Sequence, residues 1–151
     1  EFIELAGKVN QHAPYVSVER VERALNDLGL PVKGSRIAII GVSYKAGVGD
    51  MRESPALKII ERLGRLGASL VYHDDYVPAL PSFGLENAAL DTALEGADLA
   101  VVVTAHPGVD FHAVAERLPV VDLRGVLRDR RAVARPPRAP LSVDGSRATA
   151  I

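Results

Sequence analysis

Two cationic residues lie in or beside a glycine-containing loop that directly follows an apolar run. The run is Ile37-Ala38-Ile39-Ile40, the loop contains Lys45 and Arg52, and Ser54 and Pro55 precede a segment of helical periodicity. A strand, a loop and a helix N-terminus in this order form anion sites in parallel α/β sheets. A lysine reaches a phosphate as a point charge, and an arginine contacts it with two donors. This stretch therefore predicts a site for a ligand that carries phosphate or carboxylate.

A third cation, Arg124, follows the apolar run at 120–123. The carboxyl ends of parallel strands face one ligand crevice, so Arg124 is a candidate for the same cleft as Lys45. A solvated arginine at a strand end is an equally good interpretation from sequence alone.

Two acidic residues, Asp74 and Asp75, follow the apolar run at 69–73, where a dinucleotide fold places the acid that binds a ribose. The glycines after the first run, Gly41, Gly47 and Gly49, do not have the G-x-G-x-x-G spacing of that fold. The acidic pair is therefore weak evidence for a dinucleotide site.

Two other patterns resemble sites without matching their spacing. His106, Asp110 and His112 lie close in sequence but form no known metal-ligand motif, so we expect no metal site. Ser43 lies in a stretch similar to a nucleophile elbow, but Lys45 replaces the second glycine of that motif. We therefore expect neither a serine nucleophile nor any other catalytic residue in this chain.

Composition limits the function classes further. The 151 residues are 48% hydrophobic and 25% charged with a net charge of −1, which is typical of one globular domain without a general attraction to nucleic acid. The chain has no cysteine, which excludes a disulfide scaffold, a thiolate zinc site and a cysteine nucleophile within it. No apolar run is long enough to span a membrane, and we expect a cytoplasmic protein.

The elements that must position these residues alternate between strand and helix. Apolar runs predict strands at 36–42, 69–73, 99–103 and 120–123, and helical periodicity predicts helices from Ser54 to Gly67, at 87–94 and at 111–118. The two prolines within 76–84 indicate a surface loop. This order predicts an α/β fold with a Rossmann-like, doubly wound parallel sheet.

A helical arm precedes this unit. Residues 1–28 show two apolar stripes, and we expect a break between them at Pro14, with Ser17 capping the second helix. We expect three parts: an arm at 1–29, the sheet domain at 30–131, and a poorly ordered tail rich in arginine and proline at 132–151.

Several motifs in order resemble the UDP-glucose and GDP-mannose dehydrogenase family, specifically its C-terminal, UDP-binding domain. They are Gly41-Val42-Ser43-Tyr44-Lys45, Asp50-Met51-Arg52-Glu53-Ser54-Pro55-Ala56-Leu57, Tyr72-His73-Asp74, Thr104-Ala105-His106 and Val121-Asp122-Leu123-Arg124. The start of the chain, from Phe2 to Pro14, resembles the end of the family's central dimerisation segment. The pattern is most similar to the UDP-N-acetylglucosamine and UDP-N-acetylmannosamine 6-dehydrogenase branch.

The resemblance implies an activity and a role for each cation. The family oxidises the C6 alcohol of a UDP-sugar to a carboxylate with two NAD molecules, a step in polysaccharide precursor synthesis. It implies that Lys45 and Arg124 bind the UDP-sugar, that Arg52 reaches the NAD diphosphate, and that an N-terminal domain binds most of the NAD. It also implies a homodimer formed through the helical segment.

Two family features are missing from this sequence: the catalytic cysteine and the glycine fingerprint. We therefore expect either one domain of a longer enzyme or a degenerate relative. Two further hypotheses remain open: a structural or dimerisation module without catalysis, and an independent NAD-binding Rossmann domain with Asp74 on the ribose.

Overall fold

Four parallel strands form the centre of the molecule. The computed structural model describes residues 2–128, with side chains from residue 12 onward. The strands β1 (Arg36–Ile40), β2 (Ser69–His73), β5 (Leu99–Val102) and β6 (Val120–Asp122) pair in the order β2-β1-β5-β6. In this register Ile40 pairs with His73 and Val102, and Val102 pairs with Asp122, so all four strands end at one edge of the sheet. We call this edge the carboxyl edge.

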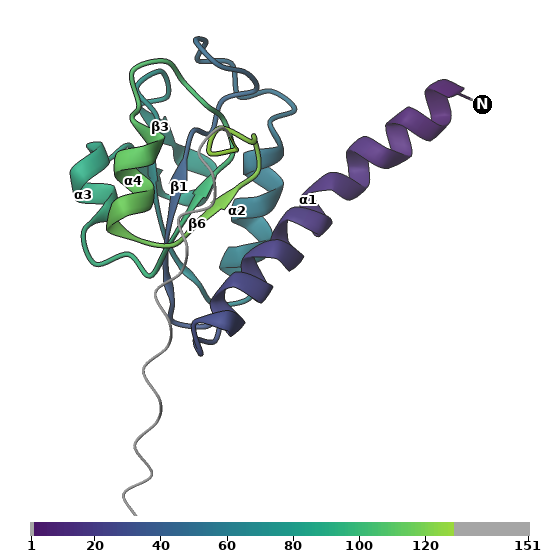
Figure 1. Ribbon diagram of the computed structural model, residues 1–151. Coiled ribbons are helices and arrows are strands. Elements are labelled where there is room, and N and C mark those ends of the chain that lie inside the picture. The colour runs from purple at the N-terminus through teal and green to yellow at the C-terminus, as the bar shows by residue number, and fades with distance from the viewer. Residues whose placement is uncertain (1, 129–151) are drawn as a thin grey trace, which may run out of the picture.

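Helices cover both faces of the sheet (Figure 1). On one face, α1 (Phe2–Asp27) and α2 (Pro55–Arg65) share a core with Ile37 and Ile39 of β1. On the other face, α3 (Leu90–Leu94) and α4 (Phe111–Arg117) pack with Ala38 and Ile40. Successive residues of β1 thus enter opposite cores, which explains its apolar run and confirms the predicted doubly wound α/β fold.

The predicted break at Pro14 is wrong. α1 is one helix of 26 residues with Pro14 inside it, and Ser17 donates its hydroxyl hydrogen bond to the Ala13 carbonyl instead of capping a new helix. Pro14 is buried, and Val18, Val21 and Leu25 anchor the later turns in the core. Packing therefore offsets the backbone hydrogen bond that proline removes.

α2 starts where the sequence predicts. Ser54 is the N-cap, its hydroxyl accepts a hydrogen bond from the Ala56 amide at 3.2 Å, and Pro55 occupies the first helical position. The apolar residues of α2 repeat along one face and are buried against the sheet: Ala56, Ile59, Ile60 and Leu63. The sequence thereby fixes where the loop after β1 must end.

The segment at 76–84 is more ordered than the surface loop predicted for it. It contains β3 (Ala79–Leu80) and the 3₁₀ turn η1 (Pro81–Phe83), and β3 pairs with β4 (Leu85–Glu86) in a small antiparallel sheet. Val77 and Leu80 are buried, and the Tyr72 hydroxyl donates to the Val77 carbonyl. Burial, followed by the negative charge of Asp74, raises the pKa of Tyr72 to about 12. The predicted helix at 87–94 is correspondingly shorter, since α3 begins at Leu90.

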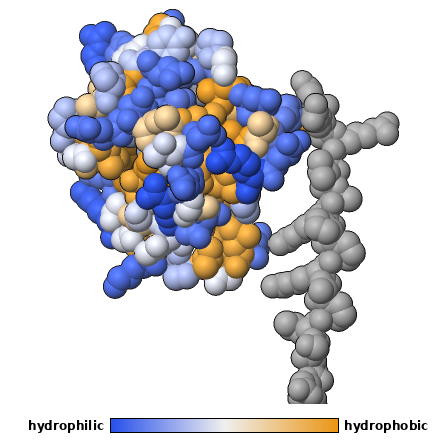
Figure 2. All heavy atoms as spheres, turned by 90° about the vertical axis from the view of Figure 1, so that its left-hand side faces the viewer, coloured by the Kyte–Doolittle hydropathy of each residue, from blue (hydrophilic) through white to orange (hydrophobic). Residues whose placement is uncertain are grey.

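Figure 2 shows the face that carries α3 and α4, where hydrophobic residues reach the surface in small groups among hydrophilic ones. None of the helices within residues 2–128 has the length and hydropathy needed to cross a bilayer. The tail predicted at 132–151 lies outside the described residues.

Candidate functional site

The loop after β1, residues 41–54, leaves the carboxyl edge of the sheet and carries two of the three predicted site residues. Gly41 has a φ of +80°, and a Cβ there would lie 2.1 Å from the Thr104 carbonyl oxygen. Only glycine allows the chain to turn this close to the end of β5. The Thr104 hydroxyl in turn donates to the Ser43 carbonyl at 2.7 Å, so the loop base is fixed against the neighbouring strand end.

A buried carboxylate joins three strand ends beneath this loop. Asp74, directly after β2, accepts hydrogen bonds through Oδ2 from the amides of Val42 and Ser43 at 2.8 and 3.1 Å, and through Oδ1 from the Tyr76 amide at 2.9 Å. Its fourth donor is the ring nitrogen Nε2 of His106 at 2.8 Å. The side chain of Asp74 is fully buried, so these four donors replace the water that a charged carboxylate would otherwise require.

His106 connects this carboxylate to the outer part of the loop. Its Nδ1 accepts a hydrogen bond from the Gly47 amide at 3.0 Å, while Nε2 lies 2.8 Å from Asp74 and 3.0 Å from the Ser43 hydroxyl. The Tyr76 ring covers the imidazole, with ring centres 4.6 Å apart. We call Ser43, Gly47, Asp74 and His106 the strand-end network.

The network contains a serine, a histidine and an aspartate but lacks the geometry of a hydrolase triad. Ser43 and Asp74 both approach Nε2, so the ring cannot pass a proton from one to the other. Ser43 is buried, and its hydroxyl donates to the Lys45 carbonyl. This geometry argues against Ser43 as a nucleophile.

The position of Asp74 argues against the alternative hypothesis that it contacts a ribose. Its oxygens are occupied by internal donors, and the residue is 1% exposed. Asp75 is exposed instead, with Oδ1 3.7 Å from Nε2 of His73. The hypothesis of an independent NAD-binding domain with Asp74 on the ribose thus loses its main residue.

Lys45 and Arg124 lie on loops that leave the same edge of the sheet. Lys45 belongs to the loop after β1, and Arg124 follows the end of β6, with β5 between the two strands. Two strand spacings separate β1 from β6 by about 10 Å. Both residues are exposed, and neither side chain forms an ion pair with another described residue.

A second carboxylate organises the turn that presents Arg124. Asp122 accepts hydrogen bonds from the amides of Arg124, Gly125 and Leu127 at 3.0, 2.8 and 2.9 Å. Burial alone would raise the pKa of Asp122, but the backbone donors outweigh burial and lower the pKa. The Arg20 guanidinium donates to the Asp122 carbonyl at 3.1 Å, which connects α1 to the same turn.

Arg52 has a partner within its own loop. Its Nε and Nη2 donate to the two oxygens of Asp50 at 3.1 and 3.0 Å. Hydrogen bonds from the guanidinium and the backbone of Arg52 lower the pKa of Asp50 to about 2. The Arg52 side chain is 88% exposed, so its remaining donors face solvent.

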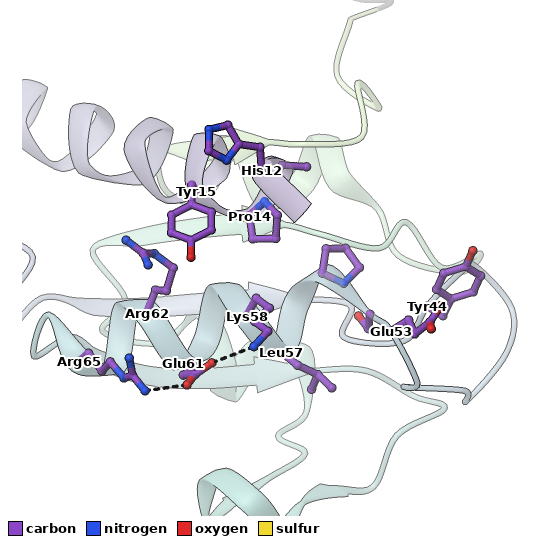
Figure 3. Close-up of a pocket in the computed structure, with 13 residues that line it drawn as sticks. His12, Pro14, Tyr15, Tyr44, Glu53, Leu57, Lys58, Glu61, Arg62 and Arg65 are labelled. Atoms are coloured by element: carbon purple, nitrogen blue, oxygen red, sulfur yellow. Dashed lines mark hydrogen bonds and ion pairs between the residues drawn. The ribbon is translucent and has the colours of Figure 1, made fainter. Parts of the chain in front are cut away.

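A groove of about 1160 Å³ lies beside this loop, between α1 and α2 (Figure 3). The Arg62 guanidinium lies 4.0 Å from the centre of the Tyr15 ring, and Glu61 pairs with both Lys58 and Arg65. Tyr44 and Glu53 of the loop close one end of the groove. Its lining includes none of the three predicted cations, so the groove is distinct from the carboxyl-edge site.

Sequence reasoning missed the strand-end network. A usable signal was present: polar residues follow three strands that are neighbours in the sheet, at Ser43, Asp74 and His106. In the sequence, His106 was instead considered as a metal ligand with Asp110 and His112, although their spacing fits no known motif. Among the described residues, no three histidine, aspartate or glutamate side chains are grouped as metal ligands would be.

Comparison with known proteins agrees with this fold. Residues 38–131 match the model of the UDP-glucose/GDP-mannose dehydrogenase family, UDP binding domain. The NDP-N-acetyl-D-galactosaminuronic acid dehydrogenase of Ralstonia nicotianae is 32% identical over 139 residues, which cover 87% of this chain and 31% of that protein. The UDP-N-acetyl-D-mannosamine dehydrogenase of Pyrococcus horikoshii is 26% identical over 133 residues, or 84% of this chain and 30% of that protein.

Solved structures show the same fold. The UDP-D-ManNAc dehydrogenase from Pyrococcus horikoshii superposes with a TM-score of 0.72 at 24% identity, covering 87% of this chain and 31% of that one. The NDP-N-acetyl-D-galactosaminuronic acid dehydrogenase from Methanosarcina mazei gives 0.69 at 26% identity, covering 78% and 25%. The chain thus spans about a third of the length of the relatives it matches.

Proposed function

Because this chain belongs to the UDP-glucose/GDP-mannose dehydrogenase family, we propose that residues 30–131 are the nucleotide-sugar-binding domain of an NAD-dependent UDP-sugar 6-dehydrogenase. The reaction would convert a C6 alcohol to a carboxylate for polysaccharide precursors, in the cytoplasm. The 151 residues contain no cysteine, so the covalent chemistry of this oxidation would need residues from outside this sequence.

The observation that carries the proposal is the pair of exposed cations on the carboxyl edge. Lys45 and Arg124 extend from separate loops of one edge and have no ion-pair partner among the described residues. A diphosphate carries the charge that such an edge attracts, and an arginine can contact two of its oxygens. We assign both residues to the UDP part of the substrate.

Within the proposal, NAD contacts this domain mainly through Arg52. Asp74 is buried and its oxygens accept internal hydrogen bonds, which argues against its use as the acid for the adenosine ribose in this chain. Arg52 is exposed and donates two hydrogen bonds to Asp50, and its remaining donors face solvent, where they could contact a diphosphate at the domain's rim.

Calorimetric titration of the 151-residue chain with UDP tests the assignment. We expect Lys45→Ala and Arg124→Ala each to lower the UDP affinity by at least about tenfold, because each removes a charge-assisted contact. Lys33→Ala and Arg65→Ala are the matched controls. Lys33 precedes β1 and Arg65 ends α2, so both lie away from the carboxyl edge, and their loss should leave the affinity unchanged.

Two outcomes would contradict the proposal. A folded chain that binds NAD but not UDP would favour an independent NAD-binding domain. A folded chain that binds neither ligand would favour a structural module, the other hypothesis that the sequence leaves open.

A further inference from the structure

The outer half of the loop after β1 depends on a single side chain outside the loop. Within residues 45–50, the hydrogen bonds found in the described part of the chain are local, with one exception: the Gly47 amide donates to Nδ1 of His106. Lys45 lies two residues before this amide. The Lys45 backbone is thus held at two points: its carbonyl accepts a hydrogen bond from the Ser43 hydroxyl at 3.0 Å, and the Gly47 amide two residues later donates to His106.

The same contact defines the protonation state of the ring. An Nδ1 atom that accepts a hydrogen bond from an amide carries no proton, so the ring proton is on Nε2. That nitrogen lies 2.8 Å from Oδ2 of Asp74 and donates to it. His106 is thus a neutral bridge, with its donor side on the sheet and its acceptor side on the loop.

Packing holds the bridge in place. His106 is 4% exposed and lies under the Tyr76 ring, and the amide of Tyr76 donates to the same Asp74 carboxylate. The loop also approaches the Tyr76 backbone closely, since a Cβ on Gly49 would lie 2.5 Å from the Tyr76 carbonyl oxygen. Backbone and ring contacts therefore leave the imidazole one orientation.

We propose that His106 is a positioning residue for nucleotide binding: its Nδ1 holds the Gly47 amide and thereby fixes Lys45 at the carboxyl edge. The effect on UDP affinity rests on the proposed function, whereas the effect on the loop does not. His106 itself is buried, so this role acts through the loop.

Two substitutions of His106 test its donor at Nε2 and its acceptor at Nδ1 separately. In His106→Gln the amide nitrogen can replace Nε2 as the donor to Asp74, but no acceptor remains at the Nδ1 position. In His106→Asn the side-chain oxygen can replace Nδ1 as the acceptor for Gly47, but the donor to Asp74 is lost. His112→Gln makes the same chemical change on α4, apart from the network, and is the matched control.

We expect His106→Gln to keep a melting temperature close to that of the unchanged chain, to speed exchange of the Gly47 amide hydrogen, and to lower UDP affinity by about tenfold. His106→Asn should lower the melting temperature, because a buried carboxylate loses a donor, and should retain slow Gly47 exchange. In the unsubstituted chain, nitrogen NMR should show the His106 proton on Nε2.

The outcomes distinguish this proposal from the proposed function. Unchanged Gly47 exchange in a folded His106→Gln variant would overturn the positioning role. A proton on Nδ1 in the unsubstituted chain would also overturn it, and this measurement does not depend on the folding of any variant. Unchanged UDP affinity in a His106→Gln variant with a released loop would also overturn it. Absence of UDP binding by the unsubstituted chain would overturn the proposed function, and Gly47 exchange would still decide whether His106 holds the loop.

Discussion

At the scale of single residues, the carboxyl edge depends on close backbone contacts that few side chains permit. Gly41 combines a left-handed φ with a position against the Thr104 carbonyl. Gly96 has a similar φ of +68°, but no heavy atom lies within 4 Å of the Cβ that an alanine would add. The two glycines therefore separate the cost of backbone strain from the cost of a steric clash.

We expect Gly41→Ala to lower the free energy of unfolding by more than about 3 kcal/mol, because the backbone must move to relieve the clash. Gly96→Ala should cost only the strain of a left-handed alanine, about 1 to 2 kcal/mol. Urea denaturation measures both. Equal losses would mean that the contact with Thr104 does not constrain the loop.

The residue scale also shows what the sequence could and could not reveal. Lys45, Arg52 and Arg124 could be proposed as site residues because charge after an apolar strand is visible in the sequence. Asp74 and His106 were harder to interpret, because their roles depend on which strands are neighbours. Once β1 is placed between β2 and β5, the polar residues after these strands must meet.

At the scale of elements, strands and helices were predicted where local pattern and packing agree. β1 is buried on both faces, and Ser54 and Pro55 define the start of α2. The predicted helix break at Pro14 was wrong because the packing of α1 overrides local propensity. The segment 76–84 was predicted as a surface loop because its prolines occur beside residues that are in fact buried, Val77 and Leu80. Tertiary contacts of this kind leave no periodic signal.

The turn after β6 is an element whose order depends on one ionised group. The pKa of Asp122 is lowered, so its stabilising effect is present above the unfolded pKa of about 3.9 and is lost as the pH falls through the lower folded pKa. Asp122→Asn should lower the melting temperature at pH 7 by about 2 to 4 °C. When the pH is lowered below 4, the melting temperature of Asp122→Asn should fall less than that of the unsubstituted chain.

Thermal melts across this pH range check the prediction. Asp27→Asn is the control, because Asp27 is an exposed aspartate at the end of α1. Parallel curves for Asp122→Asn and the unsubstituted chain would show that the turn does not depend on the charge. A loss of UDP affinity in Asp122→Asn would further connect the turn to Arg124.

At the scale of the whole molecule, α1 distinguishes this chain from a simple three-layer domain. Its C-terminal half packs on α2 and the sheet, while its N-terminal half extends away from the rest of the structure (Figure 1). Tyr15 and Val16, near its middle, are 47% and 52% exposed. We propose that a second copy of the chain covers this helix and forms a homodimer.

Val16→Asp should raise the dimer dissociation constant by at least about tenfold, because it introduces a charge into an apolar contact. Leu66→Asp is the matched control, since Leu66 is a 42% exposed apolar residue beyond the end of α2. Sedimentation equilibrium over a range of concentrations measures both constants. A single-chain mass at every concentration would contradict the dimer.

The continuity of α1 through Pro14 has a mechanical consequence. A helix of 26 residues is about 39 Å long at the usual rise per residue. If it moves as a stiff rod, a rotation of about 10° at one end displaces the other by about 7 Å, whereas a flexible joint at Pro14 would absorb most of that swing. Arg20, whose guanidinium contacts the Asp122 carbonyl just before Arg124, lies on this helix, so a rotation of α1 would be transmitted to the carboxyl edge.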